Sequence, residues 1–376
     1  MTKDELTILQ PGEYTEEDVE QLRKGSEIWR EVDIYASQLE ELLEIKYPDN
    51  QQRQLQKVAF LKTNSKHKGA WVYYPWSGVL LHCIGPQELF ELRTNRNQNL
   101  ITKDEQQKLH SSVIGVAGMS VGAGIATGAV YAGISKTIKI ADFDQLETAN
   151  LNRIREALVN IGQAKVSLAK QHILELDPFS DVQTFSEGLT ASNIDDFFSK
   201  PKLDVVVDEI DDFKLKVLLR VKSKENKIPL LMFTSLGDNI LVDVERYDQN
   251  ADQLLFNGAI GDVAEEILSN DAISDADIKR YAVQIVGVNY VPTRALESLL
   301  HIGTSLVGRP QLYSTVAVDG GLAAYIIRQM LLGADLKSGR YFIKFAEFFD
   351  IASREFTDEE SRNNILMKIM GPKSEK

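Results

Sequence analysis

The feature that most constrains the fold is an alternation of short apolar segments with helical segments from Ser112 to about Gly237. The segment "SVIGVAG" enters a glycine-rich turn before "VGAGIATGAVYAG", and the apolar segments "TIKIADFD", "DVQTFSEG", "LDVVVDEID" and "IPLLMFTSLG" follow. "LDVVVDEID" is apolar almost throughout, which is the pattern of a strand covered on both faces. Strands that alternate with helices predict an α/β fold, a doubly wound, Rossmann-like and mostly parallel sheet with helices on both faces.

Residues 1–90 predict a small N-terminal α+β domain. Thr15 followed by Asp18 predicts an N-cap for a helix through "EEDVEQLRKGSEIWREV", and "YASQLEELLEIKY" predicts a second helix that ends at Pro48. The aromatic and β-branched run from residue 71 to 84 predicts a β-hairpin.

Residues 91–352 are expected to form the nucleotide-binding domain, with an irregular, partly helical insertion near residues 250–310. Around this insertion, "NILVDVERYD" predicts a strand that leaves the parallel part, "VDGGLAAYIIRQMLLG" a buried helix, and "GRYFIKFAEFF" a late strand. Residues 353–376 are expected to be a charged C-terminal tail with a frayed helix.

Composition narrows the classes of partner. The formal net charge is −13, which argues against a nucleic-acid or anionic-membrane partner because phosphates would be repelled. Cys83 is the single cysteine, and the five histidines show no metal-ligand spacing, so no zinc is expected. The chain shows no signal-peptide pattern and no window as long as a membrane span. We therefore expect a soluble, cytoplasmic protein without a membrane partner.

The turn from Gly115 to Gly122 lies between a predicted strand and a predicted helix, where backbone amides can hold phosphate. Its spacing departs from G-x-G-x-x-G, since Ala117 and Ser120 stand where glycines would be expected. A tight strand–helix turn without a ligand is an equally good interpretation. No G-x-x-x-x-G-K-[ST] pattern is present, which disfavours a P-loop phosphotransferase.

The segment that begins at Asp142 is more specific. A carboxylate at the end of the second strand is where nucleotide ribose hydroxyls are held. An Asn-Leu-Asn-Arg turn ending in Arg153 follows, then Arg155 and Lys165. Several cations near a nucleotide are needed when the charge of a triphosphate must be offset during transfer. The alternative is a solvated loop whose asparagines cap helices.

Three aspartates close a later strand in "DVVVDEIDDFKLK": Asp208, Asp211 and Asp212. A carboxylate at this strand end can hold the Mg²⁺ that accompanies ATP. A helix N-cap role for Asp211 or Asp212 explains the motif equally well when it is taken alone.

Together the glycine-rich turn, D-x-D, N-L-x-R, downstream lysine and D-x-x-D resemble the ThiF, MoeB and ubiquitin-activating adenylyltransferase superfamily over roughly residues 90–245. The resemblance implies that Asp142 binds ribose, that Arg153 and Lys165 contact ATP phosphates, and that Asp211 coordinates Mg²⁺. The candidate nucleotide-binding residues are Gly115, Ala117, Gly118, Ser120, Asp142, Asp144, Asn150, Arg153 and Lys165.

The upstream element "RTNRNQ" resembles a short arginine-containing element that this superfamily places before the first strand. Under this resemblance the chain is a homodimer, and Arg96 is donated into the neighbouring subunit's site. The alternative is that Arg96 is a surface arginine in a connecting segment.

The implied activity is adenylation of a carboxylate by ATP with Mg²⁺, releasing pyrophosphate. The carboxylate would belong to a ubiquitin-like C-terminus, a peptide or a small acid. No cysteine follows the predicted core, and Cys83 before it is expected to be a buried small hydrophobe. The adenylate is therefore expected to be released, or captured by an amine or by a partner's thiol.

Two other functions remain open. A NAD- or FAD-binding oxidoreductase uses a similar turn, but it leaves Arg153 and Lys165 unexplained. A non-catalytic nucleotide-binding scaffold of the same fold is favoured by the altered turn at Ala117 and Ser120.

Overall fold

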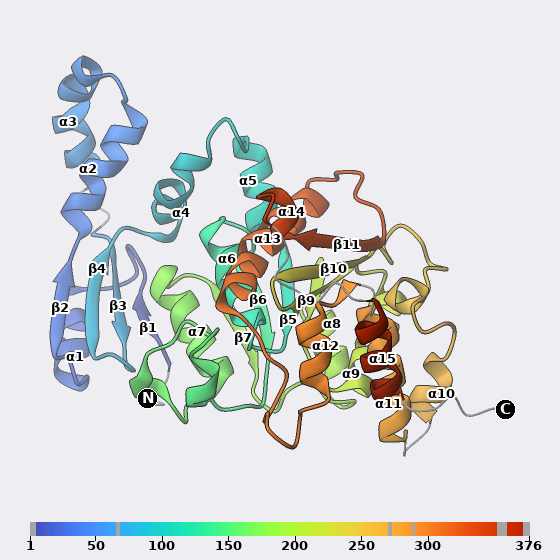
Figure 1. Ribbon diagram of the computed structural model, residues 1–376. Helices are drawn as coiled ribbons and strands as arrows, with labels where there is room; N and C mark the ends of the chain where they lie inside the picture. The colour runs from blue at the N-terminus through green and yellow to red at the C-terminus, as the bar shows by residue number, and fades with distance from the viewer. Residues whose placement is uncertain (1–4, 65–67, 270–272, 288–289, 352–358, 371–376) are drawn as a thin grey trace. The chain divides into compact units, whose positions relative to one another are not determined.

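The computed structural model describes residues 5–64, 68–269, 273–287, 290–351 and 359–370. The chain divides into two compact units, Met1–Gln106 and Gln107–Lys376 (Figure 1). Within the described residues, no helix combines the length and the apolar character needed to cross a membrane.

The first unit holds a four-stranded sheet of order β1-β3-β4-β2 with helices beside it. A small core of Val19, Leu22, Trp71, Tyr73 and Leu80 packs between helix α1 and the sheet. Its elements are β1 (Thr7–Leu9), α1 (Glu16–Gly25), β2 (Arg30–Asp33), α2 (Tyr35–Lys46), α3 (Asn50–Asn64), β3 (Ala70–Tyr74), β4 (Val79–Cys83), α4 (Pro86–Thr94) and the 3₁₀ turn η1 (Asn95–Asn97).

The N-cap predicted at the start of α1 is confirmed. The Asp18 carboxylate accepts from the Thr15 backbone amide at 2.7 Å, and the Thr15 hydroxyl accepts from the Asp18 amide at 3.3 Å. The predicted length of this helix is wrong, because α1 ends at Gly25 and residues 30–33 form strand β2, parallel to β4. Glycine has low helix propensity, and pairing with β4 satisfies the backbone groups of residues 30–33.

The hairpin predicted for residues 71–84 is confirmed as the antiparallel pair β3–β4. Cys83 ends β4 and is 2% exposed, as expected of a small hydrophobe. Helix α3 (Asn50–Asn64), which was not predicted from the sequence, has no fully buried residue.

The second unit is built on a seven-stranded sheet of order β11-β10-β9-β8-β5-β6-β7. The strands from β9 to β7 are mutually parallel, and β10 and β11 are antiparallel additions at one edge. The predicted doubly wound α/β fold and the predicted departure of β10 from the parallel part are both confirmed. The strands are β5 (Val113–Ala117), β6 (Thr137–Ala141), β7 (Asp181–Phe185), β8 (Val205–Asp208), β9 (Leu230–Leu236), β10 (Asn239–Glu245) and β11 (Gly339–Lys344).

Three groups of helices pack together in the second unit: α6 with α7 and α13, α9 with α8 and α10, and α15 with α11 and α12. The first group packs closely at glycines, since a Cβ on Gly128 would lie 2.9 Å from the Gly320 carbonyl oxygen. The helices are α5 (Lys103–His110), which crosses the boundary of the two units, α6 (Gly122–Tyr131), α7 (Lys165–Leu176), α8 (Ile194–Ser199), α9 (Phe213–Asn226), α10 (Ala264–Ser269), α11 (Asp275–Val286), α12 (Thr293–Leu299), α13 (Tyr313–Leu331), α14 (Phe345–Phe348) and α15 (Glu359–Met370), with 3₁₀ turns η2 (Thr148–Asn150), η3 (Leu158–Asn160) and η4 (Leu255–Gly258).

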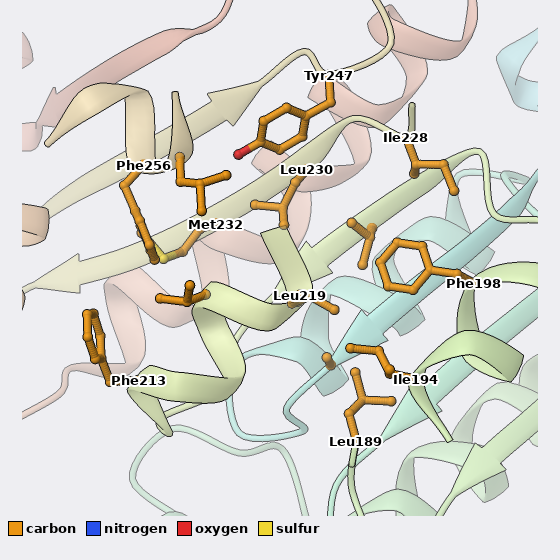
Figure 2. Close-up of a cluster of buried hydrophobic side chains, with 14 of the residues drawn as sticks. Leu189, Ile194, Phe198, Phe213, Leu219, Ile228, Leu230, Met232, Tyr247 and Phe256 are labelled. Carbon is orange, nitrogen blue, oxygen red and sulfur yellow. The ribbon is translucent and has the colours of Figure 1, made fainter. Parts of the chain in front are cut away.

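The core beside α9 joins this helix to β8 and β9, with Leu219, Leu230 and Met232 among its buried side chains (Figure 2). A buried ion network lies at its edge. Arg220 is fully buried, and its guanidinium donates to Asp208 at 2.6 Å and to Glu245 at 2.8 Å. Asp208, a strand-end carboxylate in the sequence, therefore ties β8 to α9 and β10.

Strand register brings the predicted site residues to one place. Ala117, the last residue of β5, pairs with Ala141 of β6 and with Asp208 of β8. The three loops that leave these strands therefore start side by side at the carboxyl edge of the sheet. The strand order reverses at β5, and such switch points are where open α/β sheets bind ligands.

Candidate functional site

A pocket of about 1070 Å³ lies at this switch point within the second unit. Its lining comes from the β5–α6 turn, the loops after β6, β7 and β8, strand β9, helix α11 and the segment before α13. The candidate residues that line it are Ala117, Gly118, Ser120, Asp142, Asp144, Asn150, Arg153, Lys165 and Asp211. The structure thus brings together nine of the eleven residues given a nucleotide, metal or catalytic role from the sequence.

Gly115 and Arg96 are the two exceptions. Gly115 is inside β5, and a Cβ there would lie 2.7 Å from the side chains of Leu203 and Phe197, so this glycine serves packing beneath the turn. Arg96 is exposed on η1 in the first unit. Its proposed role in a neighbouring subunit's site stays a prediction.

The β5–α6 turn depends on Gly118. Its φ is +93°, and a Cβ would lie 2.2 Å from the Glu209 carbonyl oxygen, so a side chain fits neither the backbone conformation nor the space. The Gly118 amide donates to the Ala141 carbonyl at 2.7 Å. The turn is therefore held against the starts of the loops after β6 and β8.

Asp142 is 9% exposed and lies directly after β6. Its carboxylate accepts from the backbone amides of Met119 at 2.5 Å and Asp144 at 2.7 Å. Burial raises the pKa of Asp142, and these two amide hydrogen bonds oppose the rise. The carboxylate thus fixes the shape of the turn and faces the pocket, where an acceptor for ribose hydroxyls is expected.

Arg153 lies over the turn. Its Nε donates to Ser120 Oγ at 3.2 Å, and its NH1 donates to the Asn152 side chain at 2.9 Å. Burial lowers the pKa of Arg153, Asp211 opposes this, and the Arg309 guanidinium lowers it further. The serine that departs from the glycine pattern therefore provides an acceptor that orients an arginine.

Lys165 is the first residue of α7 and is 8% exposed. Its ammonium group lies 2.7 Å from Asp144 Oδ2, and its amide donates to the Asp144 carbonyl at 2.9 Å. The carboxamide oxygen of Asn150 accepts from the Glu147 amide at 3.0 Å within a capping box. Asp144 and Asn150 therefore shape the loop that carries Arg153 and Lys165.

Two residues with a bearing on the site were missed in the sequence. Arg309 and Glu209 both line the pocket. Arg309 lies in the segment before α13, more than 150 residues from Arg153 in the chain, and nothing in its neighbourhood signalled a site. Glu209 follows β8 inside the "DEIDD" run, so its place at a strand end was a usable signal.

Glu209 interacts electrostatically with Asp319, a second buried acid. Its Oε1 accepts from the Phe233 amide at 2.9 Å, and Ser235 on the same strand donates to Asp319 at 3.0 Å. Burial raises the pKa of Glu209 well above the usual range, and the Asp319 carboxylate adds to this. Burial raises the pKa of Asp319 to about 7.

The described residues of the pocket include no cluster of side chains that could hold a metal ion by themselves. Across the ranges that the structure describes, no group of three or more histidine, cysteine, aspartate or glutamate side chains is arranged to hold a metal ion. Asp211 is exposed at the pocket, and none of the described residues hydrogen bonds to its carboxylate. Asp212 instead caps α9, accepting from the Leu215 amide at 2.7 Å.

Comparison with known proteins gives the family. The ThiF family profile matches residues 93–364. A protein of Mycobacterium tuberculosis, uncharacterized protein MT1398, is 34% identical over 280 residues, which cover 74% of this chain and 38% of that protein. The tRNA threonylcarbamoyladenosine dehydratase of Bacillus subtilis is 30% identical over 155 residues, covering 41% of this chain and 59% of that enzyme.

A crystal structure of E. coli MccB with ATP aligns with a TM-score of 0.48 and 16% identity, covering 80% of this chain and 77% of the other. The chain spans less than two thirds of the length of the two sequence relatives described above. The family match nevertheless covers most of the chain, including both sides of the pocket. The chain belongs to the ThiF family.

Proposed function

We propose that this chain uses ATP to adenylate a substrate carboxylate. One carboxylate oxygen attacks the α-phosphorus of ATP, the bond from that phosphorus to the oxygen bridging to the β-phosphate breaks, and pyrophosphate leaves. A carboxylate is already ionised near neutral pH, so the step needs no proton acceptor. The observation that carries the proposal is one pocket that joins a glycine turn, Asp142 and the cations Arg153 and Lys165.

The roles of the residues follow from their positions. We assign ribose binding to Asp142 and phosphate binding to the amides of the β5–α6 turn, which stand at the N-terminus of α6. Arg153 and Lys165 would offset the charge that builds up on the phosphates during transfer. In this role Lys165 exchanges its ion pair with Asp144 for a phosphate oxygen.

Mg²⁺ fits this arrangement as an ion that arrives with ATP. Magnesium is usually held by one or two carboxylates together with substrate phosphates and water, rather than by a protein cage. The exposed Asp211 carboxylate at the pocket suits that pattern. Bound there, the ion would supply positive charge beside the phosphates, and Asp211 would position it.

The relatives differ in the substrates that their names imply, from tRNA threonylcarbamoyladenosine to molybdopterin synthase and ubiquitin-like modifiers. The net charge of −13 favours a substrate other than nucleic acid for this chain. A protein C-terminus, a peptide or a small acid suits it better. Since Cys83 is the single cysteine, we propose that the adenylate is released or captured by an amine or a partner's thiol.

The experiment that tests the chemistry is isotope exchange between labelled pyrophosphate and ATP, run with pooled N-acetyl amino acids and a library of short peptides. Exchange that depends on a carboxylate is the expected result. Exchange that is absent with every pool, while the protein binds ATP, would leave a nucleotide-binding scaffold as the better description.

The nucleotide itself is tested by ligand-induced stabilisation. A ligand that binds the native state alone raises stability, by an amount that grows with the logarithm of its concentration relative to Kd. ATP with Mg²⁺ should therefore raise the unfolding temperature, and NAD should not. A larger rise with NAD than with ATP would favour the oxidoreductase alternative.

We also propose a homodimer in which Arg96 completes the neighbouring subunit's site. A two-fold dimer would place one such arginine at each site. Mixing inactive Arg96→Ala and Lys165→Ala subunits should make about half of the dimers mixed, each with one intact site, and should restore roughly a quarter of wild-type exchange. A protein that is monomeric in solution, or verified subunit exchange without recovery, would contradict this role.

A further inference from the structure

The pocket extends beyond the part that a nucleotide would fill. Asp142 follows β6, whereas β8 and β9 lie on the opposite side of β5 from β6. A nucleotide with its ribose at Asp142 and its phosphates at the β5–α6 turn leaves the β9 side of the pocket open. The whole pocket measures about 1070 Å³, at the upper limit of the roughly 300–1,000 Å³ of a typical ligand site.

The β9 side of the pocket carries a group of apolar side chains, beside Thr234, Ser235 and Lys216. The apolar side chains come from the start of α9, from β9 and from one face of α11, which is one of the helices in the 250–310 insertion. Ile285 is 6% exposed and Met232 is 3% exposed, so both are firmly packed parts of this wall. We call these residues the apolar wall: Leu215, Met232, Ile278, Ala282, Ile285 and Val286.

The apolar wall is fixed by the core behind it. Tyr281 of α11 stacks on Phe213 of α9, with ring centroids 5.4 Å apart and an angle of 12° between the planes. Ile285 and Tyr281 belong to the same buried cluster as Met232. Ser274 caps the start of α11 by accepting from the Asp277 amide at 3.1 Å. A wall held in this way is a formed surface, and its shape can select a ligand.

The cations Arg153 and Lys165 lie on the β6 side of the pocket, away from the apolar wall, whereas Glu209, Asp211 and Asp212 line it from the loop after β8. Lys216, the cation nearest to the apolar wall along α9, is engaged by the buried Asp208 at 3.1 Å. A second ligand with a charged end toward the phosphates and an apolar end toward α11 matches this division.

We propose that the apolar wall binds an aliphatic or aromatic side chain of the carboxylate substrate. The substrate class is then a carboxylic acid with an apolar side chain at the carbon next to the carboxyl group, and a carboxylate flanked by glycine alone is a poor substrate. This inference rests on the proposed adenylation, which requires the second ligand's carboxylate to reach the α-phosphorus.

The test compares pyrophosphate exchange driven by N-acetyl-leucine with that driven by N-acetylglycine, and Gly-Gly-Gly-Leu with tetraglycine, so that the free acids and the peptides are judged separately. The expected preference for leucine in kcat/KM is about 10–200-fold, the range that one missing apolar group gives in an enzyme pocket. The preference should appear in at least one of the two pairs.

Ala282→Leu is the informative variant, because Ala282 is exposed and lines the pocket. The added side chain should fill the space and lower the leucine preference at least tenfold, with the KM for ATP unchanged. Gln284→Leu is the matched control, since Gln284 is exposed on the same helix and does not line the pocket. It should keep the wild-type preference.

A second readout separates this inference from the proposed function. Binding of N-acetyl-leucine and N-acetylglycine is measured by calorimetry in the presence of α,β-methylene-ATP, which cannot react. Tighter leucine binding that Ala282→Leu abolishes would support the apolar wall even if no exchange occurs, in which case adenylation fails alone. Equal exchange with leucine and glycine, or no preferential binding and no exchange, would overturn the inference.

Discussion

Arg153 Nε lies 3.2 Å from Ser120 Oγ, so the loop after β6 is joined to the turn after β5 by a side-chain hydrogen bond. Ser120 replaces a glycine of the usual dinucleotide-binding pattern, and this contact gives the replacement a physical reason. A hydroxyl at the turn holds the guanidinium over the place where phosphates are expected. The presence of Ser120 in the turn is therefore weaker support for a non-catalytic scaffold than the sequence alone suggested.

Ser120→Ala should lower the kcat/KM of adenylation about tenfold or more, because a hydrogen bond to a charged group contributes about 1.5–3 kcal/mol. Ser120→Thr keeps the hydroxyl and should retain most of the activity. Steady-state exchange kinetics of both variants check this. Equal activity of the alanine and threonine variants would show that the contact does not orient Arg153.

Arg309→Ala should lower the rate of exchange by roughly 10²-fold, because a cation that lines the pocket with Arg153 would no longer offset phosphate charge. The matched control is Arg294→Ala, since Arg294 is exposed on α12 and does not line the pocket. Exchange kinetics at saturating ATP distinguish the two. Wild-type rates in both variants would remove Arg309 from the site.

Gly118→Ala should lower the free energy of unfolding by about 2–4 kcal/mol, since the new Cβ meets the Glu209 carbonyl and the positive φ is strained. Gly124→Ala in α6 meets no atom within 4 Å and should raise stability by about 0.5–1 kcal/mol. Urea denaturation of both variants measures the difference. A neutral Gly118→Ala would mean that the turn is looser than described.

Ionisation of the buried Asp319 carboxyl should lower the free energy of unfolding as pH rises. Burial raises its pKa to about 7, whereas an aspartate in an unfolded chain titrates near 3.9. Between about pH 4 and pH 7 the folded state holds a proton that the unfolded state has lost. The contribution of Asp319 to stability is therefore fully present below the unfolded pKa and is lost as pH rises through the folded pKa.

Asp319→Asn removes this titration and keeps an acceptor for Ser235. Between pH 5 and pH 8 the wild type should lose about 2–3 kcal/mol more stability than the variant. Asp252→Asn, at an exposed position, should follow the wild type. Urea denaturation at both pH values checks this, and parallel losses in wild type and Asp319→Asn would contradict a buried protonated carboxyl.

The parallel sheet could be predicted because its strands are buried on both faces and are therefore nearly continuous apolar runs. The strand ends could be predicted too, and parallel register then places Gly118, Asp142 and Asp211 together. Strand β2 could not be predicted, since it is exposed and follows a helical pattern whose end depends on Gly25. Pairing with β4 decides its conformation, and that partner is about 50 residues further along the chain.

The parts of the site that come from the 250–310 insertion could not be predicted from the sequence either. Some apolar residues of α11 pack in the core and others line the pocket. The periodicity of the sequence does not distinguish a buried position from a pocket position. Arg309 is one exposed arginine among many in the sequence. Its significance comes from lying beside Arg153 in the fold, which local sequence patterns do not encode.

Adenylation in this pocket is tested most directly by pyrophosphate exchange by Arg153→Ala and Lys165→Ala, with a carboxylate that the wild type accepts. Each variant should lose roughly 10²–10³-fold, the scale seen when one preorganised electrostatic group is removed, with the fold intact by circular dichroism. Lys170→Ala, on α7 but outside the pocket, should exchange at the wild-type rate. Full exchange in both pocket variants would contradict the account, because the chemistry would then take place elsewhere.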